Sequence, residues 1–313
     1  MTAWKILLTD GLEENGQEIL RKSADVVNNP TITAEDLLKV VGEYDALIVR
    51  GRTKVTQAVL EAGRKLKVVG RSGVGVDNID LNAAIEKKVT VVNAPVATSI
   101  SVAELTMALM LALVREIPRA DAAIKNGKWL KKELEGKELY HKTLGVIGFG
   151  HIGRLVADRA HAFGMQVIVF DPKLSAEQIK QYGGFSVSFD DLLRQSDFIT
   201  LHLPLNNETR GMINGEAFSK MKKGAHILCA ARGGVIDEAA LLTALESGQL
   251  AGAALDVFST EPPGQTALVS HPHVICTPHV GGQTVEGQER AAVDISNEVL
   301  AALKNETLHW RVA

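Results

Sequence analysis

The sequence predicts an α/β fold with two domains, each built on a doubly wound parallel sheet. Its 313 residues suffice for two domains of ordinary size. Short apolar runs alternate with segments of helical period, a pattern typical of parallel strands joined by helices. The alternation occurs in two series, one before residue 100 and one after residue 142, so we expect one sheet in each.

The first series predicts a small five-stranded sheet. Its strands are expected at Lys5–Leu8, Asp25–Val27, Ala46–Val49, Lys67–Val69 and Val89–Asn93, the second being the weakest pattern. Its helices are expected at Asn15–Lys22, Ala34–Val41, Gln57–Ala62 and Leu81–Glu86. Strands and helices in this order complete one doubly wound domain.

The second series predicts a larger sheet. Its strands are expected at Thr143–Ile147, Gln166–Phe170, Asp197–His202, Ala225–Ala230, Ala251–Val257 and His273–Cys276. A strongly apolar helix at Ser101–Ile117 is expected to connect the domains, with Ser101 and Glu104 spaced as in a capping box.

The last helical segment, about Val285–Lys304, is expected to return to the first sheet. The first domain would then be discontinuous, comprising residues 1–97 plus 285–313. Residues 98–284 would form the second domain.

Composition excludes several classes of protein. The 34 basic and 37 acidic residues give a net charge of -3, so no overall positive field favours nucleic acid. The longest apolar run, Leu105–Val114, is shorter than the ~20 residues that span a bilayer. The start of the chain lacks the pattern of a secretory signal. Cys229 and Cys276 lack ligand-like spacing, so we expect two reduced thiols and no metal site. Because neither a secretory signal nor a membrane span is indicated, we expect a cytoplasmic location.

The strongest local motif is a glycine-rich turn, Gly148-Phe149-Gly150-His151-Ile152-Gly153. It follows the predicted strand Thr143–Ile147 and precedes a helical segment, Ile152–Phe163. In this context the glycines permit a tight turn, close approach of a diphosphate, and close packing of helix and strand. The diphosphate would lie at the helix N-terminus.

Asp171 supports a dinucleotide site. It follows the next predicted strand, where this fingerprint expects a carboxylate for the ribose hydroxyls. A carboxylate also repels a 2′-phosphate, which favours NAD over NADP, although Lys173 and Arg154 lie nearby in the sequence. The alternative is a glycine-rich turn followed by a solvated aspartate.

Three further polar residues follow predicted strands of the second series, namely Arg232, Glu261 and His279. Ligands of open α/β sheets bind beyond the carboxyl ends of the strands, where these residues are expected. Hydride transfer to a carbonyl needs a cation, a proton donor and a partner for that donor, and Arg, His and Glu fit these roles. Taken singly, each could equally be a surface or turn residue. The other eight histidines are expected to be structural.

Together these segments resemble the D-isomer-specific 2-hydroxyacid dehydrogenases. The resemblance covers the whole chain and rests on the stretches Arg71–Asp80, Gly148–Gly153, Ala231–Glu238, Gly252–Phe258 and Thr277–His279. It implies a Rossmann NAD-binding domain and a smaller flavodoxin-like substrate domain, with substrate bound between them. The segments Ile48–Arg50, Asn126–Trp129 and Gly281–Thr284 are most similar to members that oxidise 3-phosphoglycerate in serine biosynthesis.

The resemblance also implies roles for individual residues. Arg232 matches the arginine that binds the substrate, His279 the general acid/base, and Glu261 the acid that pairs with that histidine. Further substrate contacts would come from Arg50, Arg71 and the amides of Ser72, Gly73 and Val74, the last of which is Thr in many relatives. The positions matching cofactor contacts are Val74, Gly148, Gly150, His151, Ile152, Gly153, Asp171, Leu203, Ala230, Ala231, Asp256, Gly281 and Gly282, with Asp256 facing the nicotinamide carboxamide.

The substrate and the assembly are less determined by sequence. Arg50, Arg71, Lys128, Lys131 and Lys132 could bind a phosphate, which favours 3-phosphoglycerate. If they are ordinary surface charges, the reaction would be reduction of an unphosphorylated keto acid such as glyoxylate or hydroxypyruvate. The resemblance implies a homodimer or tetramer without C-terminal regulatory domains. An NAD-sensing corepressor is an alternative of another class, but the complete Arg–Glu–His set favours an enzyme.

Overall fold

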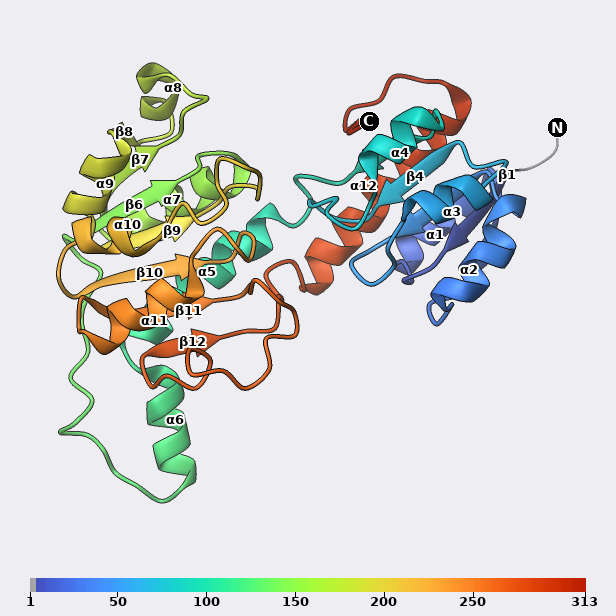
Figure 1. Cartoon of the computed structure of the whole chain (residues 1–313). Helices are drawn as coiled ribbons and strands as arrows, with labels where there is room; N and C mark the ends of the chain where they lie inside the picture. Colours follow the sequence, from blue (N-terminus) through green and yellow to red (C-terminus); the bar gives the residue numbers. More distant parts are fainter. Residues whose placement is uncertain (1–3) are drawn as a thin grey trace. The chain divides into compact units, whose positions relative to one another are not determined.

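The computed structural model describes residues 4–313, which divide into two compact units (Figure 1). Unit 1 comprises Met1–Ser99 and Gly282–Ala313, and unit 2 comprises Ile100–Gly281. Each unit has its own parallel sheet with helices on both faces.

The sheet of unit 1 has five parallel strands in the order β2-β1-β3-β4-β5. This is the order of a flavodoxin-like doubly wound domain, as the sequence predicted. All five predicted strands are present, including the weak second one. Their bounds are β1 Trp4–Leu8, β2 Ala24–Asn28, β3 Ala46–Val49, β4 Val68–Arg71 and β5 Thr90–Asn93.

Alternate side chains of these strands enter two separate cores. Leu7 faces the layer of α2 (Ala34–Val40), the short 3₁₀ turn η1 (Val41–Glu43), α3 (Gln57–Ala62) and α4 (Leu81–Glu86). Ile6 and Leu8 face α1 (Glu14–Arg21) and α12 (Val285–Lys304). Both faces are therefore apolar, as a doubly covered parallel sheet requires.

The last helix, α12, belongs to unit 1 and packs closely on α1. A Cβ at Gly16 would lie 2.7 Å from the carbonyl oxygen of Ala292, so only glycine allows this approach. The Ser296 hydroxyl donates to the Gly16 carbonyl oxygen over 3.0 Å, which fixes the two helices at the same point.

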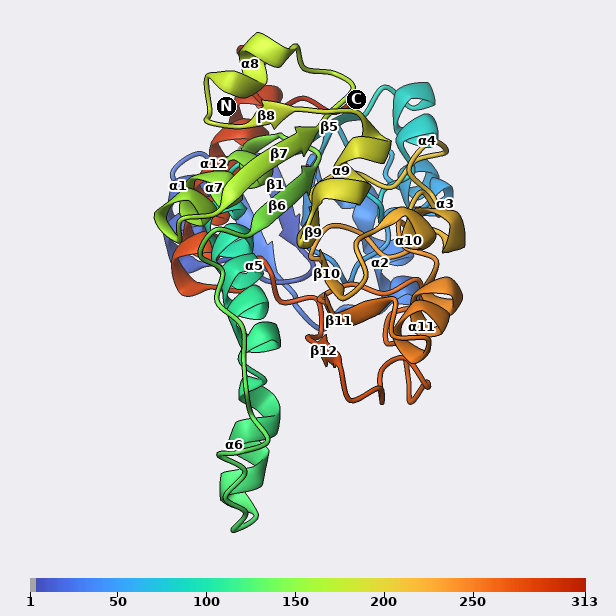
Figure 2. The same cartoon turned by 90° about the vertical axis from the view of Figure 1, so that its left-hand side faces the viewer.

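The sheet of unit 2 has seven parallel strands in the order β12-β11-β10-β9-β6-β7-β8 (Figure 2). The strand order reverses between β6 and β9, which is the switch point of a Rossmann sheet. The strands are β6 Thr143–Ile147, β7 Gln166–Phe170, β8 Phe185–Ser186, β9 Phe198–Leu201, β10 Ala225–Cys229, β11 Leu250–Leu255 and β12 Val274–Cys276. The two-residue β8 was not predicted, because so short a strand has no periodicity.

Helices cover both faces of this sheet. Residues of α5 (Ser99–Val114), α7 (His151–Ala162) and α8 (Ala176–Lys180) pack in one core. Residues of α9 (Phe189–Gln195), α10 (Gly215–Lys220) and α11 (Glu238–Glu246) pack in the other. Helix α6 (Ile117–Lys125) protrudes from the rest of the unit (Figure 2).

The predicted capping box at Ser101 is wrong. Helix α5 begins two residues earlier, at Ser99, so Ser101 lies inside its first turn and is buried. The apolar run Leu105–Val114 supplies Met107, Met110 and Leu113 to the core of its own unit. Packing within one chain therefore accounts for this run.

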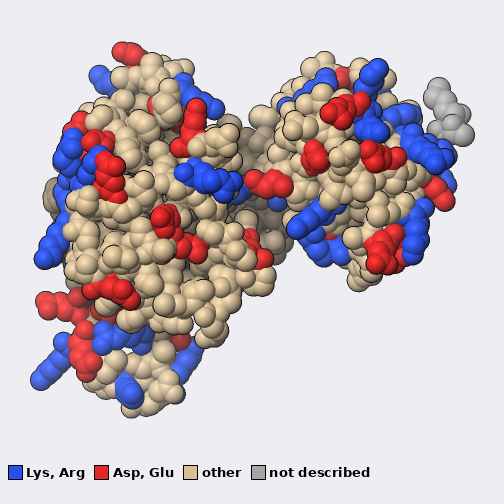
Figure 3. Space-filling view, viewed as in Figure 1, with Lys and Arg blue, Asp and Glu red and all other residues tan. Residues whose placement is uncertain are grey.

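The surface carries charges of both signs. Acidic and basic side chains are interspersed on the face of each unit that Figure 3 shows. Among residues 4–313, no helix combines the length and the apolar character needed to cross a membrane.

Two buried histidines make the stability of the fold depend on pH. Burial lowers the pKa of His202 to about 3 and, with a smaller effect of Lys137, that of His226 to about 4. Between pH 6.5 and 4 the unfolded chain binds protons that the folded chain does not. The free energy of unfolding should therefore fall as the pH falls through this window, by at most about 1.4 kcal/mol per pH unit for each group.

We expect His226→Gln to reduce this loss, because one buried titrating group is removed. Urea unfolding at several pH values between 6.5 and 4 measures it. His161→Gln, at an exposed histidine, is the matched control. Equal pH dependence in wild type and His226→Gln would contradict the assignment.

Candidate active site

The turn between β6 and α7 has the form of a diphosphate site. Gly148 has a φ of 87°, and a Cβ there would collide with the His202 carbonyl. A Cβ at Gly153 would collide with the Gly148 carbonyl, whereas a Cβ at Gly150 would meet no atom within 4 Å. Packing therefore requires the first and third glycines, and the second leaves open space beside the helix.

The N-terminus of α7 offers donors to this open space. Its cap residue, Gly150, has no side chain, and the first N–H groups of a helix have no partner within the helix. The amides of His151 and Ile152 lie in this first turn. The turn thus fits the diphosphate of a dinucleotide.

Asp171 is held beside the glycine turn by two backbone donors. One carboxylate oxygen accepts from the Phe149 N–H over 2.8 Å and the other from the Lys173 N–H over 2.9 Å. Each oxygen keeps a further lone pair for a ribose hydroxyl. The guanidinium of Arg154 donates to the Phe149 carbonyl and stacks 4.0 Å from the Tyr182 ring centre. These two contacts hold Arg154 against the glycine turn and the Tyr182 ring.

His279 and Glu261 form a hydrogen-bonded pair on loops that extend from neighbouring strands. Nδ1 of His279 lies 2.8 Å from Oε2 of Glu261. The other Glu261 oxygen accepts from the Phe258 N–H over 3.1 Å, which fixes the carboxylate. Both side chains are partly exposed, and within residues 4–313 no hydrogen bond uses Nε2 of His279. This nitrogen is thus placed to exchange a proton with a bound molecule.

Asp256 fixes the loop that carries His279. Its carboxylate is only 1% exposed and accepts three hydrogen bonds, from the Thr277 hydroxyl (2.6 Å) and the N–H groups of Val280 (2.9 Å) and Gly281 (2.8 Å). Its carbonyl accepts the His279 N–H over 2.8 Å. These bonds hold His279 at a φ of 54°, a left-handed conformation that is costly for a residue with a side chain.

The Arg232 loop is tied to the Glu261 loop. Arg232 follows β10, and its Nη1 donates to the Ala231 carbonyl over 2.6 Å. Gly233 packs so closely against the Phe258 carbonyl that a Cβ would collide with it. Glu238, at the start of α11, accepts the Ser259 N–H over 2.6 Å. Arg232, Glu261 and His279 therefore lie on loops that follow the adjacent strands β10, β11 and β12.

Thr277 and Glu238 received no role from the sequence. Both occur in the motifs that carry the family resemblance, and a polar residue next to a candidate catalytic residue is the signal that could have identified them. Which loop each would contact depends on the fold and is not visible in the sequence.

Within unit 1, the loop after β4 carries the predicted substrate-binding residues Ser72, Gly73 and Val74. The Ser72 N–H donates to the Val49 carbonyl over 2.9 Å, so this amide is already used by the sheet. Within the described residues, no hydrogen bond uses the N–H groups of Gly73 or Val74, which leaves these two amides for an anion. Arg71 donates through Nη1 to the Ser72 carbonyl over 2.9 Å and lies against Gly73, whose φ is 140°.

The remaining predicted residues lie at strand ends or beside Asp256. Leu203 follows β9, Ala230 and Ala231 follow β10, and Gly281 donates to Asp256, while Gly282 begins the second segment of unit 1. Cys229 lies just before Ala230, and burial raises the pKa of its thiol to about 11. It therefore stays a neutral thiol. No group of three or more potential metal ligands occurs within residues 4–313.

The fold and these loops define a dinucleotide-dependent α/β oxidoreductase site, and a family comparison specifies the class. Residues 107–281 match the family described as D-isomer specific 2-hydroxyacid dehydrogenase, NAD binding domain. The chain belongs to this family, and its cofactor is NAD.

Within this family, the chain is similar in sequence to two proteins that share one name. The chain is 49% identical to D-3-phosphoglycerate dehydrogenase of Methanocaldococcus jannaschii over 96% of its own length and 58% of that protein. It is 47% identical to D-3-phosphoglycerate dehydrogenase of Bacillus subtilis over 96% of its length and 57% of that protein. The chain thus spans little more than half the length of these relatives.

Solved structures show the same fold over whole chains. A glyoxylate reductase from Paecilomyes thermophila is 33% identical, with a TM-score of 0.91 over 100% of this chain and 99% of that one. D-lactate dehydrogenase from Aquifex aeolicus, solved with NAD and lactic acid, is 32% identical, with a TM-score of 0.82 over 96% of each chain.

The glycine turn allows a paired test. Gly150→Ala should keep the melting temperature nearly unchanged but weaken NADH binding by about 10-fold or more, because its methyl group enters the space left for the diphosphate. Gly153→Ala should instead lower the melting temperature, because its methyl group collides with the Gly148 carbonyl.

NADH fluorescence titration and thermal unfolding of the same samples measure both effects. Unchanged NADH affinity in a folded Gly150→Ala variant would exclude this turn as the diphosphate site.

Proposed function

We propose that this chain is an NAD-dependent D-2-hydroxyacid dehydrogenase that oxidises 3-phosphoglycerate to 3-phosphohydroxypyruvate. The observation that carries the proposal is the hydrogen bond between His279 and Glu261. It uses Nδ1 of His279, and Nε2 of the same ring has no partner in the described chain. Unit 2 would bind NAD and supply His279 and Arg232, and unit 1 would supply further substrate contacts.

His279 acts as the base in this direction. Nε2 accepts the proton of the substrate hydroxyl, and Glu261 at Nδ1 fixes the ring orientation and stabilises the imidazolium that forms. When bound, NAD supplies the nicotinamide carbon that takes up the hydride leaving C2. The oxygen becomes a carbonyl, and in the reverse direction His279 returns the proton.

Arg232 binds the carboxylate and the reacting oxygen. Its planar guanidinium can make two parallel hydrogen bonds to a carboxylate, which a lysine cannot reproduce. The N–H groups of Gly73 and Val74 supply further donors for the carboxylate.

Arg50 and Arg71 are the proposed ligands of the substrate phosphate. Arg50 follows β3 and Arg71 is the last residue of β4, so both lie at the carboxyl ends of their strands, where parallel sheets bind ligands. The two most similar enzymes described above carry the name D-3-phosphoglycerate dehydrogenase, which supports a phosphorylated substrate.

A second candidate is the reduction of an unphosphorylated keto acid. A glyoxylate reductase shares the fold over the whole chain, and Arg50 is ion-paired with Glu13. Both observations are compatible with a substrate that carries no phosphate.

We further propose that the enzyme is a homodimer or tetramer. Ile117, Ile124 and Trp129, on α6 and the loop that follows it, have exposed side chains. Apolar side chains exposed together are typical of an interface between subunits.

The catalytic pair is tested by His279→Ala. Turnover should fall by about 10²- to 10⁴-fold, because no group remains to accept the hydroxyl proton. NADH binding should stay near that of the wild type, since the glycine turn is untouched. Steady-state kinetics and NADH titration measure the two effects. Turnover within a few-fold of the wild type would refute the role of His279, and NADH binding without turnover in the wild type would indicate an NAD-sensing protein instead.

The substrate is tested by comparing 3-phosphoglycerate with D-glycerate, which differs only by the phosphate. We expect kcat/KM for the phosphorylated acid to be higher by about 10-fold or more, because arginines bind a phosphate dianion strongly. Glyoxylate and hydroxypyruvate are assayed in the reducing direction. Equal values for the phosphorylated and plain acids would favour the second candidate.

A further inference from the structure

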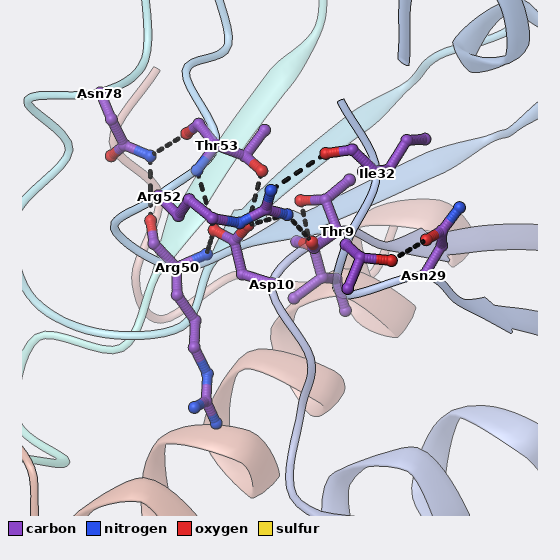
Figure 4. A network of polar contacts seen from close by, with 10 residues as sticks. Thr9, Asp10, Asn29, Ile32, Arg50, Arg52, Thr53 and Asn78 are labelled. Atoms are coloured by element: carbon purple, nitrogen blue, oxygen red, sulfur yellow. Dashed lines mark hydrogen bonds and ion pairs between the residues drawn. The ribbon is translucent and has the colours of Figure 1, made fainter. Parts of the chain in front are cut away.

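The main chain that carries Arg50 is fixed by the buried carboxylate of Asp10 (Figure 4). Asp10 is 4% exposed, and one of its oxygens accepts the N–H groups of Arg50 (2.7 Å) and Thr53 (3.1 Å). The other accepts the Thr53 hydroxyl over 2.5 Å and lies 3.1 Å from Arg52. Asn78 donates to the carbonyls of Arg50 and Thr53 over 2.9 and 2.6 Å. In the loop after β3, the N–H groups of Arg50 and Thr53 are thus bound by Asp10 and their carbonyls by Asn78.

The Arg50 side chain extends away from this network in Figure 4. Its Nη2 forms an ion pair with Oε2 of Glu13, and the two side chains are 23% and 27% exposed. Its Nε is buried and has no hydrogen-bond partner in the described chain. Arg50 therefore combines a charge that is already compensated with a donor that is still unused, and buried unused donors are rare in folded proteins.

Glu13 occupies a position where its side chain would ordinarily serve the helix. It is the N-cap residue of α1, yet it makes no capping hydrogen bond. Thr33, Asp80 and Ser188, the cap residues of α2, α4 and α9, each accept such a bond from the helix backbone. Glutamate is not among the preferred N-cap residues, and the Glu13 carboxylate pairs with Arg50 rather than with the helix backbone.

We propose that Glu13 is a specificity-determining residue that competes with the substrate phosphate for Arg50. The proposal rests on the function proposed above, in which Arg50 binds that phosphate. A phosphate monoester carries up to two negative charges and binds a guanidinium through two oxygens, as a carboxylate does. The phosphate must displace Glu13 or accept its repulsion at close range. Glu13 therefore weakens the binding of phosphorylated acids and leaves that of unphosphorylated acids unchanged.

The test is Glu13→Gln, which removes the charge and keeps the shape. We expect the KM for 3-phosphoglycerate to fall by about 3- to 10-fold, as for a partly exposed ion pair, and the KM for hydroxypyruvate to stay unchanged. The inhibition constant of inorganic phosphate against hydroxypyruvate should fall by a similar factor. The effect should shrink at high ionic strength.

The neighbouring Glu14 provides a matched control. It lies on the same helix but forms its ion pair with Arg21, so Glu14→Gln should change neither constant. Combining Glu13→Gln with Arg50→Met should abolish the effect of the first substitution, because the competition requires Arg50.

The outcomes separate this inference from the proposed substrate. If the wild type reduces hydroxypyruvate but does not oxidise 3-phosphoglycerate, the proposed substrate is wrong, and inhibition by inorganic phosphate still tests Glu13. The inference is overturned if phosphate inhibits wild type and Glu13→Gln equally or inhibits neither. It is also overturned if Glu13→Gln weakens phosphate binding, which would make Glu13 a support for Arg50, or if it changes all substrates alike.

Discussion

Both units depend on one constraint: each backbone N–H group in the loops beside the strand ends needs a hydrogen-bond acceptor. A parallel ladder no longer supplies their acceptors, and a buried N–H without a partner is costly. In this chain aspartates one or two residues after strands provide the acceptors. Asp10 binds the N–H groups of Arg50 and Thr53, Asp171 those of Phe149 and Lys173, and Asp256 those of Val280 and Gly281. Each of these loops also carries a residue of the candidate site.

Backbone N–H groups and ring nitrogens that have no partner within residues 4–313 remain available to ligands. The Ser72 amide donates to the sheet, whereas those of Gly73 and Val74 have no acceptor among residues 4–313. Nδ1 of His279 pairs with Glu261, and Nε2 has no partner in the same part of the chain. The first turn of α7 has no side-chain cap. In the proposed function these groups would bind the substrate carboxylate, exchange the hydroxyl proton and bind the diphosphate of NAD.

The sequence predicts the fold well, because the position of a buried strand is written in apolar runs. It predicts β3, β7, α3, α4 and α12 almost residue for residue. It also places Arg232, Glu261 and His279 at strand ends, because that rule depends only on strand positions. It could not show that Ser101 lies within α5, since a helix that is apolar on all sides has no clear starting point. Nor could it show which donors Asp256 or Asp10 would bind, because these partners lie 21 to 43 residues away along the chain.

The positive charge available to a substrate is smaller than the number of basic residues suggests, because several arginines already have partners. Arg52 donates to the Ile32 carbonyl and pairs with Asp10, and Arg154 stacks on Tyr182. Arg50 pairs with Glu13 and keeps only its remaining donors. The net charge of -3 therefore says little about where a small anion could bind, which depends on how far each guanidinium is compensated locally. In the proposed function, discrimination between a phosphorylated and a plain hydroxy acid would then depend on local ion pairs such as that of Arg50 with Glu13.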